Sequence, residues 1–118
     1  MKVLQNLYTD NEMYVKLDQG LTKPFITTKG VKQGCSISPF IFNLFIDKLP
    51  TVFDESCDGV LVKERKLNCL MWADDCVVFS LSKKGLQNAI DKTVNFFTSL
   101  GLSVNTKKTR CMIFKREV

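Results

Sequence analysis

Apolar and polar residues alternate in patterns that predict a helix followed by a hairpin in the first part of the chain. Residues 1–8 (MKVLQNLY) have the spacing of the last turns of a helix. The segment MYVKLD, the pair Gln19-Gly20 and a second extended stretch around KPFITT have the composition of two strands joined by a turn. We therefore expect helix and strand to be mixed from the start.

A second helix is expected to begin at Ser38, which is a good N-cap residue, with Pro39 at the first helical position, where a missing N–H has no cost. Its apolar residues are Phe40, Ile41, Phe42, Leu44, Phe45, Ile46 and Leu49. Because these side chains cover almost every face, the helix is expected to lie in the core. Pro50 is expected to end or kink it.

The loop before this helix, KQGCS, places a glycine and free backbone N–H groups near a helix N-terminus. Such a place suits a phosphate or a sugar. An ordinary glycine-containing loop that leads into a helix explains the same residues. The loop taken alone favours this simpler interpretation.

The second half of the chain predicts a hairpin, a helix and a final extended segment. Residues 67–72 and 76–81 have the composition of paired strands, after a polar turn at DESCDG. Ser82 can cap the next helix and Gly101 suits the position after its end. The residues LSVNTKKTRCMIFKRE predict two short extended pieces around a turn at residues 105–108. The apolar residues at helical spacing, for which core packing is the simplest explanation, are Leu86, Ala89, Ile90, Val94, Phe97 and Leu100.

The second hairpin carries two adjacent carboxylates, in the segment LMWADDCVVFS. Asp is a good turn residue because its side chain can bond the backbone, which explains one of Asp74 and Asp75 but not both. Two neighbouring carboxylates repel each other unless a cation neutralises them. Mg²⁺ is commonly held by one or two carboxylates together with substrate phosphates. A plain turn and a metal-dependent phosphoryl-transfer site therefore both remain open here.

The composition is that of one globular domain, and it narrows the chemistry. The 118 residues are 45% hydrophobic and 25% charged, with a net charge of +5, which fits a nucleic-acid partner without establishing one. The sequence has no histidine, which excludes Ser-His and Cys-His catalysis and His-ligated metals. It has no G-x-x-x-x-G-K-[ST] loop either. Carboxylate chemistry with a hard metal is the main catalytic option left.

The cysteines and the apolar runs indicate where in the cell the protein is found. Five cysteines, at positions 35, 57, 69, 76 and 111, contain no C-x-x-C pair, so neither a disulfide framework nor a zinc site is expected. Buried reduced thiols are the simpler interpretation. No signal peptide follows Lys2, and the longest uncharged run, residues 33–46, is too short to span a membrane. We expect an intracellular protein, in the nucleus or the cytoplasm, rather than a secreted one.

Taken together and in this order, GVKQGCSISPFIFNLFIDKL, LMWADDCVVFS and GLSVNTKKTRCMIF resemble the palm of reverse transcriptases over nearly the whole chain. The similarity is greatest to non-LTR (LINE-type) retrotransposons, with group II intron enzymes as more distant relatives. It implies an α+β fold, with an antiparallel sheet packed on helices, in a fragment of a larger right-hand polymerase. Residues 1–118 would form part of a palm domain without fingers, thumb or endonuclease.

The resemblance also implies an activity and its participants. The activity is that of an RNA-directed DNA polymerase, a nucleotidyltransferase that uses Mg²⁺, or Mn²⁺ in its place. The partners are an RNA template, a DNA primer and dNTPs. Asp74 would be a ligand of the catalytic Mg²⁺ pair, and Asp75 would have a supporting or weaker metal role. Lys108, with or without Lys107, would lie near the departing pyrophosphate, although both lysines also suit a solvated turn.

Four further residues match the binding positions of the family. Gln33 and Gly34 would line the pocket for the incoming nucleotide and the template base. Trp72 and Ala73 would lie near the end of the primer. The family usually has Tyr or Phe where Trp72 stands, and the larger indole is expected either to stack on a sugar or base or to crowd the primer terminus.

A second departure concerns the first metal-binding Asp of the family, which lies on a strand upstream of Met1. Asp10, Asp18 and Asp54 do not replace it, because each is expected in a polar turn. We therefore expect the isolated chain to be inactive. The alternative to an enzyme fragment is a truncated or domesticated remnant with at most weak nucleic-acid binding. An unrelated basic binding module has little support, since the aromatic residues are expected in the core.

Overall fold

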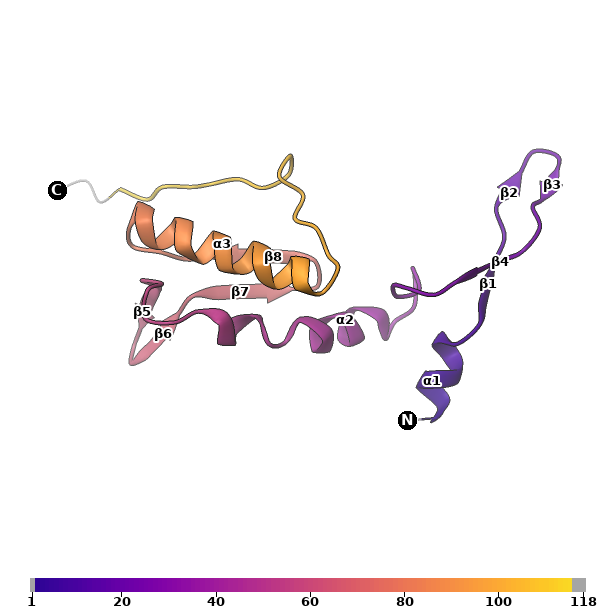
Figure 1. Cartoon of the computed structure of the whole chain (residues 1–118), viewed down its shortest axis with the longest axis horizontal. Coiled ribbons are helices and arrows are strands. Elements are labelled where there is room, and N and C mark those ends of the chain that lie inside the picture. The colour runs from indigo at the N-terminus through magenta and orange to yellow at the C-terminus, as the bar shows by residue number, and fades with distance from the viewer. Residues whose placement is uncertain (1, 116–118) are drawn as a thin grey trace. The chain divides into compact units, whose positions relative to one another are not determined.

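The computed structural model describes residues 2–115 and divides the chain into two compact units, Met1–Phe42 and Asn43–Val118. The described residues form three α-helices, one 3₁₀-helix and eight strands, which pair as four two-stranded sheets (Figure 1). All four pairings are antiparallel. The α+β class expected from the sequence is therefore confirmed, with the strands divided among small separate sheets.

The first unit begins with the predicted helix and hairpin. Helix α1 covers Lys2–Tyr8. The hairpin is a long one, in which β1 (Asn11–Met13) pairs with β4 (Phe25–Thr27) and, nearer the turn, β2 (Lys16–Leu17) pairs with β3 (Gly20–Leu21). Both predictions for this part of the chain are confirmed.

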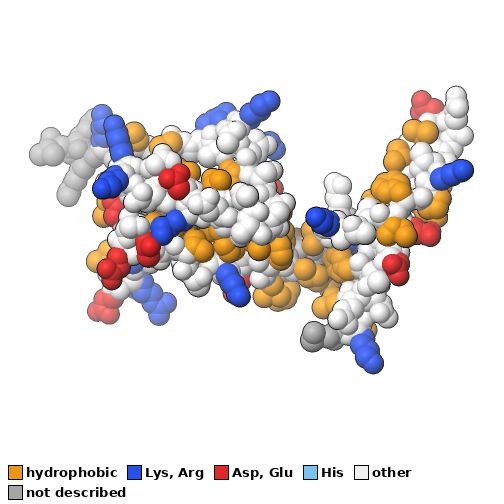
Figure 2. Space-filling view, viewed as in Figure 1, with side chains coloured by type: hydrophobic (Ala, Val, Ile, Leu, Met, Phe, Trp, Pro, Cys, Tyr) orange, Lys and Arg blue, Asp and Glu red, His pale blue; other side chains and the backbone are white. Residues whose placement is uncertain are grey.

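Helix α2 covers Ser38–Ile46, and it differs from the prediction in two ways. Ser38 is its first helical residue rather than an N-cap, and its hydroxyl donates to the carbonyl of Lys32 outside the helix. The helix was also expected in the core, but Phe40 and Leu44 are 64% and 61% exposed. No other described element covers them, and Figure 2 shows the hydrophobic side chains along this helix open to view.

The second unit packs one long helix against a hairpin and a short 3₁₀-helix. Helix α3 (Lys83–Ser99) contacts the 3₁₀-helix η1, and it also contacts the last strand of the unit (Figure 1). The side chains of Ile46, Leu49, Cys57 and Ala89 form the buried core. The remaining elements are η1 (Leu49–Val52), β5 (Val60–Val62), β6 (Arg65–Leu67), β7 (Cys69–Trp72) and β8 (Asp75–Val78).

The ends of α3 follow the sequence signals closely. The hydroxyl of Ser82 accepts a hydrogen bond from the backbone N–H of Gly85 at 3.0 Å, as an N-cap should. Gly101 follows the helix with a φ of 73°, a conformation that glycine adopts without cost. The apolar stripe of α3 is only partly covered, since Ile90 and Val94 remain 37% and 38% exposed.

One hairpin of the second unit was not predicted, and one expectation for this unit is wrong. The hairpin of β5 and β6 was missed, because its strands are short and Lys63-Glu64 is an unusual turn, with Lys63 at a φ of 56°. The extended pieces expected after Gly101 form no strand among residues 102–115. Residues 116 and 117, the end of that predicted segment, lie outside the described residues. Strands need a partner, and this segment pairs with none in the described chain.

No helix in residues 2–115 combines the length and the apolar character that a membrane crossing requires. The five cysteines are free thiols in the structure. Cys57 and Cys69 are buried, whereas Cys111 is exposed, so burial holds for only some of them.

Candidate active site

The two carboxylates singled out in the sequence lie at the tip of the β7–β8 hairpin, but not in equivalent places. Trp72 pairs with Asp75, so only Ala73 and Asp74 form the turn between the strands. Asp75 is the first residue of β8 rather than a turn residue, which corrects the expectation that both lie in the turn. Asp74 and Asp75 are both exposed. The tip therefore presents two carboxylates to solvent.

The hairpin has one face turned to solvent and one turned to the protein. The solvent face carries Trp72, which is 75% exposed, and its strand partner Asp75. Residues opposite each other on paired strands point to the same side of the sheet. The other face includes Cys76, where burial raises the pKa of the thiol to about 11 and so keeps it protonated. The side with Trp72 and Asp75 is thus the side that a ligand can reach.

The backbone of the turn is held by a side chain from α2. The N–H of Ala73 donates to Oδ1 of Asn43 at 3.0 Å. Ala73 has a φ of 50°, a left-handed conformation that is uncommon for a residue with a β-carbon. Asn43 is not among the residues predicted from the sequence. Its signal is a lone amide within the apolar run FIFNLFI, where a polar side chain needs a partner.

In the first unit, Gln33 and Gly34 lie in an exposed turn before α2. Gly34 has a φ of 78°, which favours glycine at this position. The turn is closed by the Ser38 hydroxyl, which donates to the Lys32 carbonyl at 2.7 Å and lies 3.1 Å from the Tyr8 hydroxyl. The predicted binding loop is therefore held in place by α1 and by the start of α2.

Cys35 lies beside these two residues. Its pKa is lowered by the backbone N–H of Ile37 and by the hydroxyl of Tyr8, which donates to the sulfur and stabilises the thiolate. The ammonium of Lys32 lies 5.9 Å from the centre of the Tyr8 ring. These contacts place hydrogen-bond donors and one ammonium group around the turn that contains Gln33 and Gly34.

Lys107 and Lys108 lie in a turn organised by Asn105. The side-chain oxygen of Asn105 accepts a hydrogen bond from the backbone N–H of Lys107 at 3.1 Å. The backbone carbonyl of Asn105 accepts one from the N–H of Lys108, also at 3.1 Å. Both lysines are exposed, and the ion pair found in residues 2–115 joins Asp54 to Lys92 instead. Figure 2 shows Lys and Arg side chains projecting at the edge of the unit where this segment runs. Their ammonium groups are available to an anionic ligand.

The predicted site residues thus fall into three groups. Trp72, Ala73, Asp74 and Asp75 share one hairpin, whereas Lys107 and Lys108 lie in another turn of the same unit and Gln33 and Gly34 lie in the other unit. Across residues 2–115, no three His, Cys, Asp or Glu residues come together as a metal site would require. The hairpin therefore offers the oxygen ligands that Mg²⁺ prefers, but two carboxylates rather than a full set.

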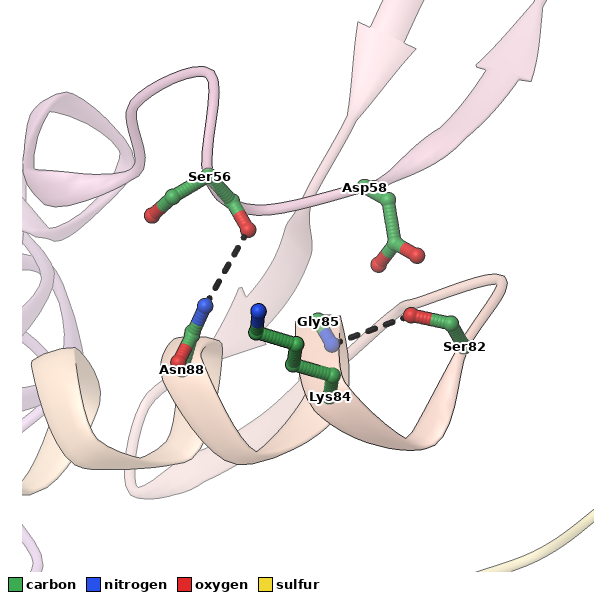
Figure 3. Close-up of a pocket in the computed structure, with 6 residues that line it drawn as sticks. All are labelled: Ser56, Asp58, Ser82, Lys84, Gly85 and Asn88. Carbon is green, nitrogen blue, oxygen red and sulfur yellow. Dashed lines mark hydrogen bonds between the residues drawn. The ribbon is translucent and has the colours of Figure 1, made fainter.

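A separate polar pocket lies at the N-terminus of α3, and none of the predicted catalytic or binding residues lines it (Figure 3). The carboxylate of Asp58 lies in this pocket, where hydrogen bonds from the hydroxyls of Ser80 and Ser82 lower its pKa. The side chain of Asn88 donates to the carbonyl of Ser56 at 3.4 Å. Side chains around the pocket thus connect the loop before β5 to α3. The Asp58 carboxylate lies near the positive end of the helix.

Comparison with known proteins places the chain in a family. Residues 1–118 match the family described as Reverse transcriptase (RNA-dependent DNA polymerase). The Retrovirus-related Pol polyprotein from type-2 retrotransposable element R2DM of Drosophila melanogaster is 34% identical over 105 residues, which are 89% of this chain. The Pol polyprotein from type-1 retrotransposable element R2 of Popillia japonica is 33% identical over 90 residues, 75% of this chain.

A more distant relative is the Transposon TX1 uncharacterized 149 kDa protein of Xenopus laevis, 24% identical over 90% of this chain. The chain spans only a small part of each of these proteins, namely 10% of the Drosophila protein, 12% of the Popillia protein and 8% of the Xenopus protein.

Proposed function

The chain belongs to the reverse transcriptase (RNA-dependent DNA polymerase) family, and we propose that residues 1–118 are part of the palm of a non-LTR retrotransposon enzyme. In the complete protein the reaction would be template-directed nucleotidyl transfer, with an RNA template, a DNA primer and dNTPs as partners. An intracellular location, in the nucleus or the cytoplasm, is part of the proposal, since the number and spacing of the five cysteines do not suit a disulfide framework.

The observation that carries the proposal is the pair of exposed carboxylates at the tip of the β7–β8 hairpin. Asp74, in the turn, is proposed as a ligand of Mg²⁺ or Mn²⁺. Asp75, on the strand beside Trp72, has the supporting role. A bound metal pair would stabilise the attacking and leaving oxygens of an in-line displacement. The unequal positions of the two carboxylates support unequal roles.

The other residues would bind substrates rather than metal. Trp72 and Ala73 would border the primer end, where the exposed indole offers a flat surface for a sugar or base. Gln33 and Gly34 would contact the incoming nucleotide. Lys108, with Lys107, would stabilise the negative charge of the departing pyrophosphate, because neither ammonium is neutralised by a carboxylate in residues 2–115.

A second candidate function is a remnant that performs no catalysis and binds nucleic acid weakly. The observation in its favour is that the described residues hold no group of three metal-binding side chains. Both candidates predict that the isolated chain is inactive. They differ in what the segment does inside a longer protein.

The test is therefore a chimera in which this segment replaces the matching residues of the Drosophila R2DM Pol polyprotein. Primer extension is measured on an RNA template with Mg²⁺ and all dNTPs. Asp74→Asn is expected to abolish extension, because it removes a charged metal ligand. Lys108→Ala is expected to slow extension without ending it, because it removes only one cation near the leaving group.

Asp47→Asn is the matched control, since Asp47 is an exposed carboxylate of the same unit outside the hairpin. It should leave extension unchanged. Equal and mild losses from Asp74→Asn and Lys108→Ala would refute the assigned roles. A chimera that folds but extends no primer, with or without these changes, would favour the remnant.

A further inference from the structure

One long-range hydrogen bond joins α2 to the turn that carries Asp74. The donor is the backbone N–H of Ala73, and the acceptor is Oδ1 of Asn43, at 3.0 Å. Both residues belong to the second unit. We propose that Asn43 is a positioning residue, whose carboxamide fixes the Ala73–Asp74 turn and thereby sets where the Asp74 carboxylate stands. The consequence for catalysis rests on the proposed function.

The turn needs such support because of its own geometry. Two residues connect β7 to β8, and the first of them, Ala73, has a φ of 50°. Two-residue hairpin turns with positive φ are normally built from Gly, Asn or Asp, which adopt this conformation more easily. Alanine has no polar side chain to stabilise the turn locally. A hydrogen bond from outside the hairpin therefore helps to select this conformation.

Asn43 is well placed to supply that bond. It lies on α2, three residues before Ile46, which is only 1% exposed and anchors the end of the helix in the core. The side chain of Asn43 is half-buried, and it is the only polar side chain in the run FIFNLFI. A buried or half-buried amide costs free energy unless its polar atoms form hydrogen bonds. The bond therefore benefits both residues, because it satisfies the Asn43 carboxamide and supports the turn at Ala73.

The bond acts on the backbone of Ala73, one residue before the proposed metal ligand. The hydrogen bond of Asn43 is to the backbone of Ala73 and not to either carboxylate, so its effect on Asp74 passes through the turn. Catalytic groups displaced by about 1 Å lose roughly 100-fold in rate. A change at Asn43 that frees the turn is thus expected to impair catalysis without removing any metal ligand.

The first experiment uses the 118-residue chain without metal and measures amide hydrogen exchange by NMR. Asn43→Leu, which keeps the size but removes the acceptor, should speed exchange at Ala73 by about 10-fold, while the Gly85 amide at the far end of the unit is unchanged. Asn43→Asp keeps an acceptor oxygen at this position, so the Ala73 amide should remain protected from exchange. Rapid exchange at Ala73 in the parent chain, or protection that survives Asn43→Leu, would overturn the proposal.

Asn88→Leu is the matched control, because it also removes one amide hydrogen bond to the backbone in the same unit (Figure 3). It should leave the Ala73 amide protected. If Asn43→Leu and Asn88→Leu speed exchange at Ala73 equally, Asn43 contributes only general stability, and the positioning role is wrong.

The second experiment uses the R2DM chimera and separates kcat from KM. Asn43→Leu should lower kcat by roughly 10-fold or more with little change in the KM for dNTP, and Asn88→Leu should change neither. A rise in KM alone, with kcat unchanged, would overturn the positioning role. If the parent chimera shows no extension that depends on Asp74, the proposed function fails, and the amide exchange at Ala73 alone decides the role of Asn43 in the turn.

Discussion

Neighbouring residues with the same side chain occupy different structural positions in this protein. Asp74 lies in a two-residue turn, and Asp75 begins a strand with its side chain on the face that carries Trp72. The sequence predicted the hairpin, because apolar runs on both sides of the two carboxylates are a local signal. It did not predict which carboxylate lies in the turn, because register depends on pairing between strands.

Among the interactions of single residues, hydrogen bonds between positions far apart in the sequence were the hardest to predict. Asn43 and Ala73 are thirty positions apart, and neither residue alone indicates the bond between them. The cluster of Tyr8, Lys32 and Ser38 around the Gln33–Gly34 turn was missed for the same reason. Side-chain hydrogen bonds to remote backbone atoms depend on the fold, so sequence patterns with a fixed spacing do not reveal them.

The ion pair between Asp54 and Lys92 predicts a pH dependence of stability. Nζ of Lys92 lies 2.7 Å from Oδ2 of Asp54, and hydrogen bonds from Lys92 and Ser56 hold the pKa of this carboxyl well below its usual range. A lowered folded-state pKa gives stability that is present above the unfolded value, about 3.9, and is lost as the pH falls through the folded value.

Asp54→Asn should therefore lower the urea midpoint at pH 7, and the gap between variant and parent should narrow as the pH falls below about 4. Both side chains are partly exposed, so the effect is modest and should shrink in high salt. Asp47→Asn, outside this ion pair, is the control. A gap that stays constant from pH 7 to low pH would show that the ion pair does not act in this way.

The sequence predicts the ends of α3 correctly, but for α2 it predicts neither the place of Ser38 nor the exposure of the helix surface. The beginning and end of α3 were expected because Ser82 and Gly101 act through bonds within a few residues. The exposure of Phe40 and Leu44 on α2 was not expected. An apolar pattern indicates that a helix face favours burial, but it does not indicate which other element covers that face. The absent strands after Gly101 have a related cause, because a strand requires a partner.

Removal of the α3 cap tests how much this helix contributes to the stability of the second unit. Ser82→Ala should destabilise the chain by about 1 kcal/mol, because the N–H of Gly85 loses its acceptor at the positive end of the helix. Thermal and urea unfolding give the value. Ser103→Ala, at an exposed serine beyond the end of α3, serves as control and should be close to neutral. A neutral Ser82→Ala would mean that the cap adds nothing.

At the scale of the whole molecule, the net charge of +5 predicts weak binding to RNA or DNA with little sequence preference. Affinity should fall steeply with salt, since binding releases counterions. Changing Lys107 and Lys108 together to Ala should reduce the salt slope by about 1.5. Fluorescence anisotropy with a labelled oligonucleotide at several salt concentrations measures this. An unchanged slope, equal to that of Lys66→Ala, would exclude the lysine turn from the interface.

The isolated chain should show no primer extension, because fixing two metal ions requires more carboxylates than the β7–β8 hairpin provides. Purified protein with a primed template, dNTPs and Mg²⁺ or Mn²⁺ checks this, and Asp74→Asn controls for contaminating polymerase. Extension that this substitution eliminates would mean that the chain assembles a complete site, for example as an oligomer.

If Asp74 and Asp75 form a metal-binding hairpin, a Mn²⁺ titration of the isotope-labelled chain should reveal the site. Paramagnetic broadening should begin at residues 72–76, at metal concentrations that reflect weak binding by two carboxylates. It should weaken strongly in Asp74→Asn and persist in Asp47→Asn. Broadening centred elsewhere, or none at millimolar metal, would show that these two carboxylates do not bind the metal.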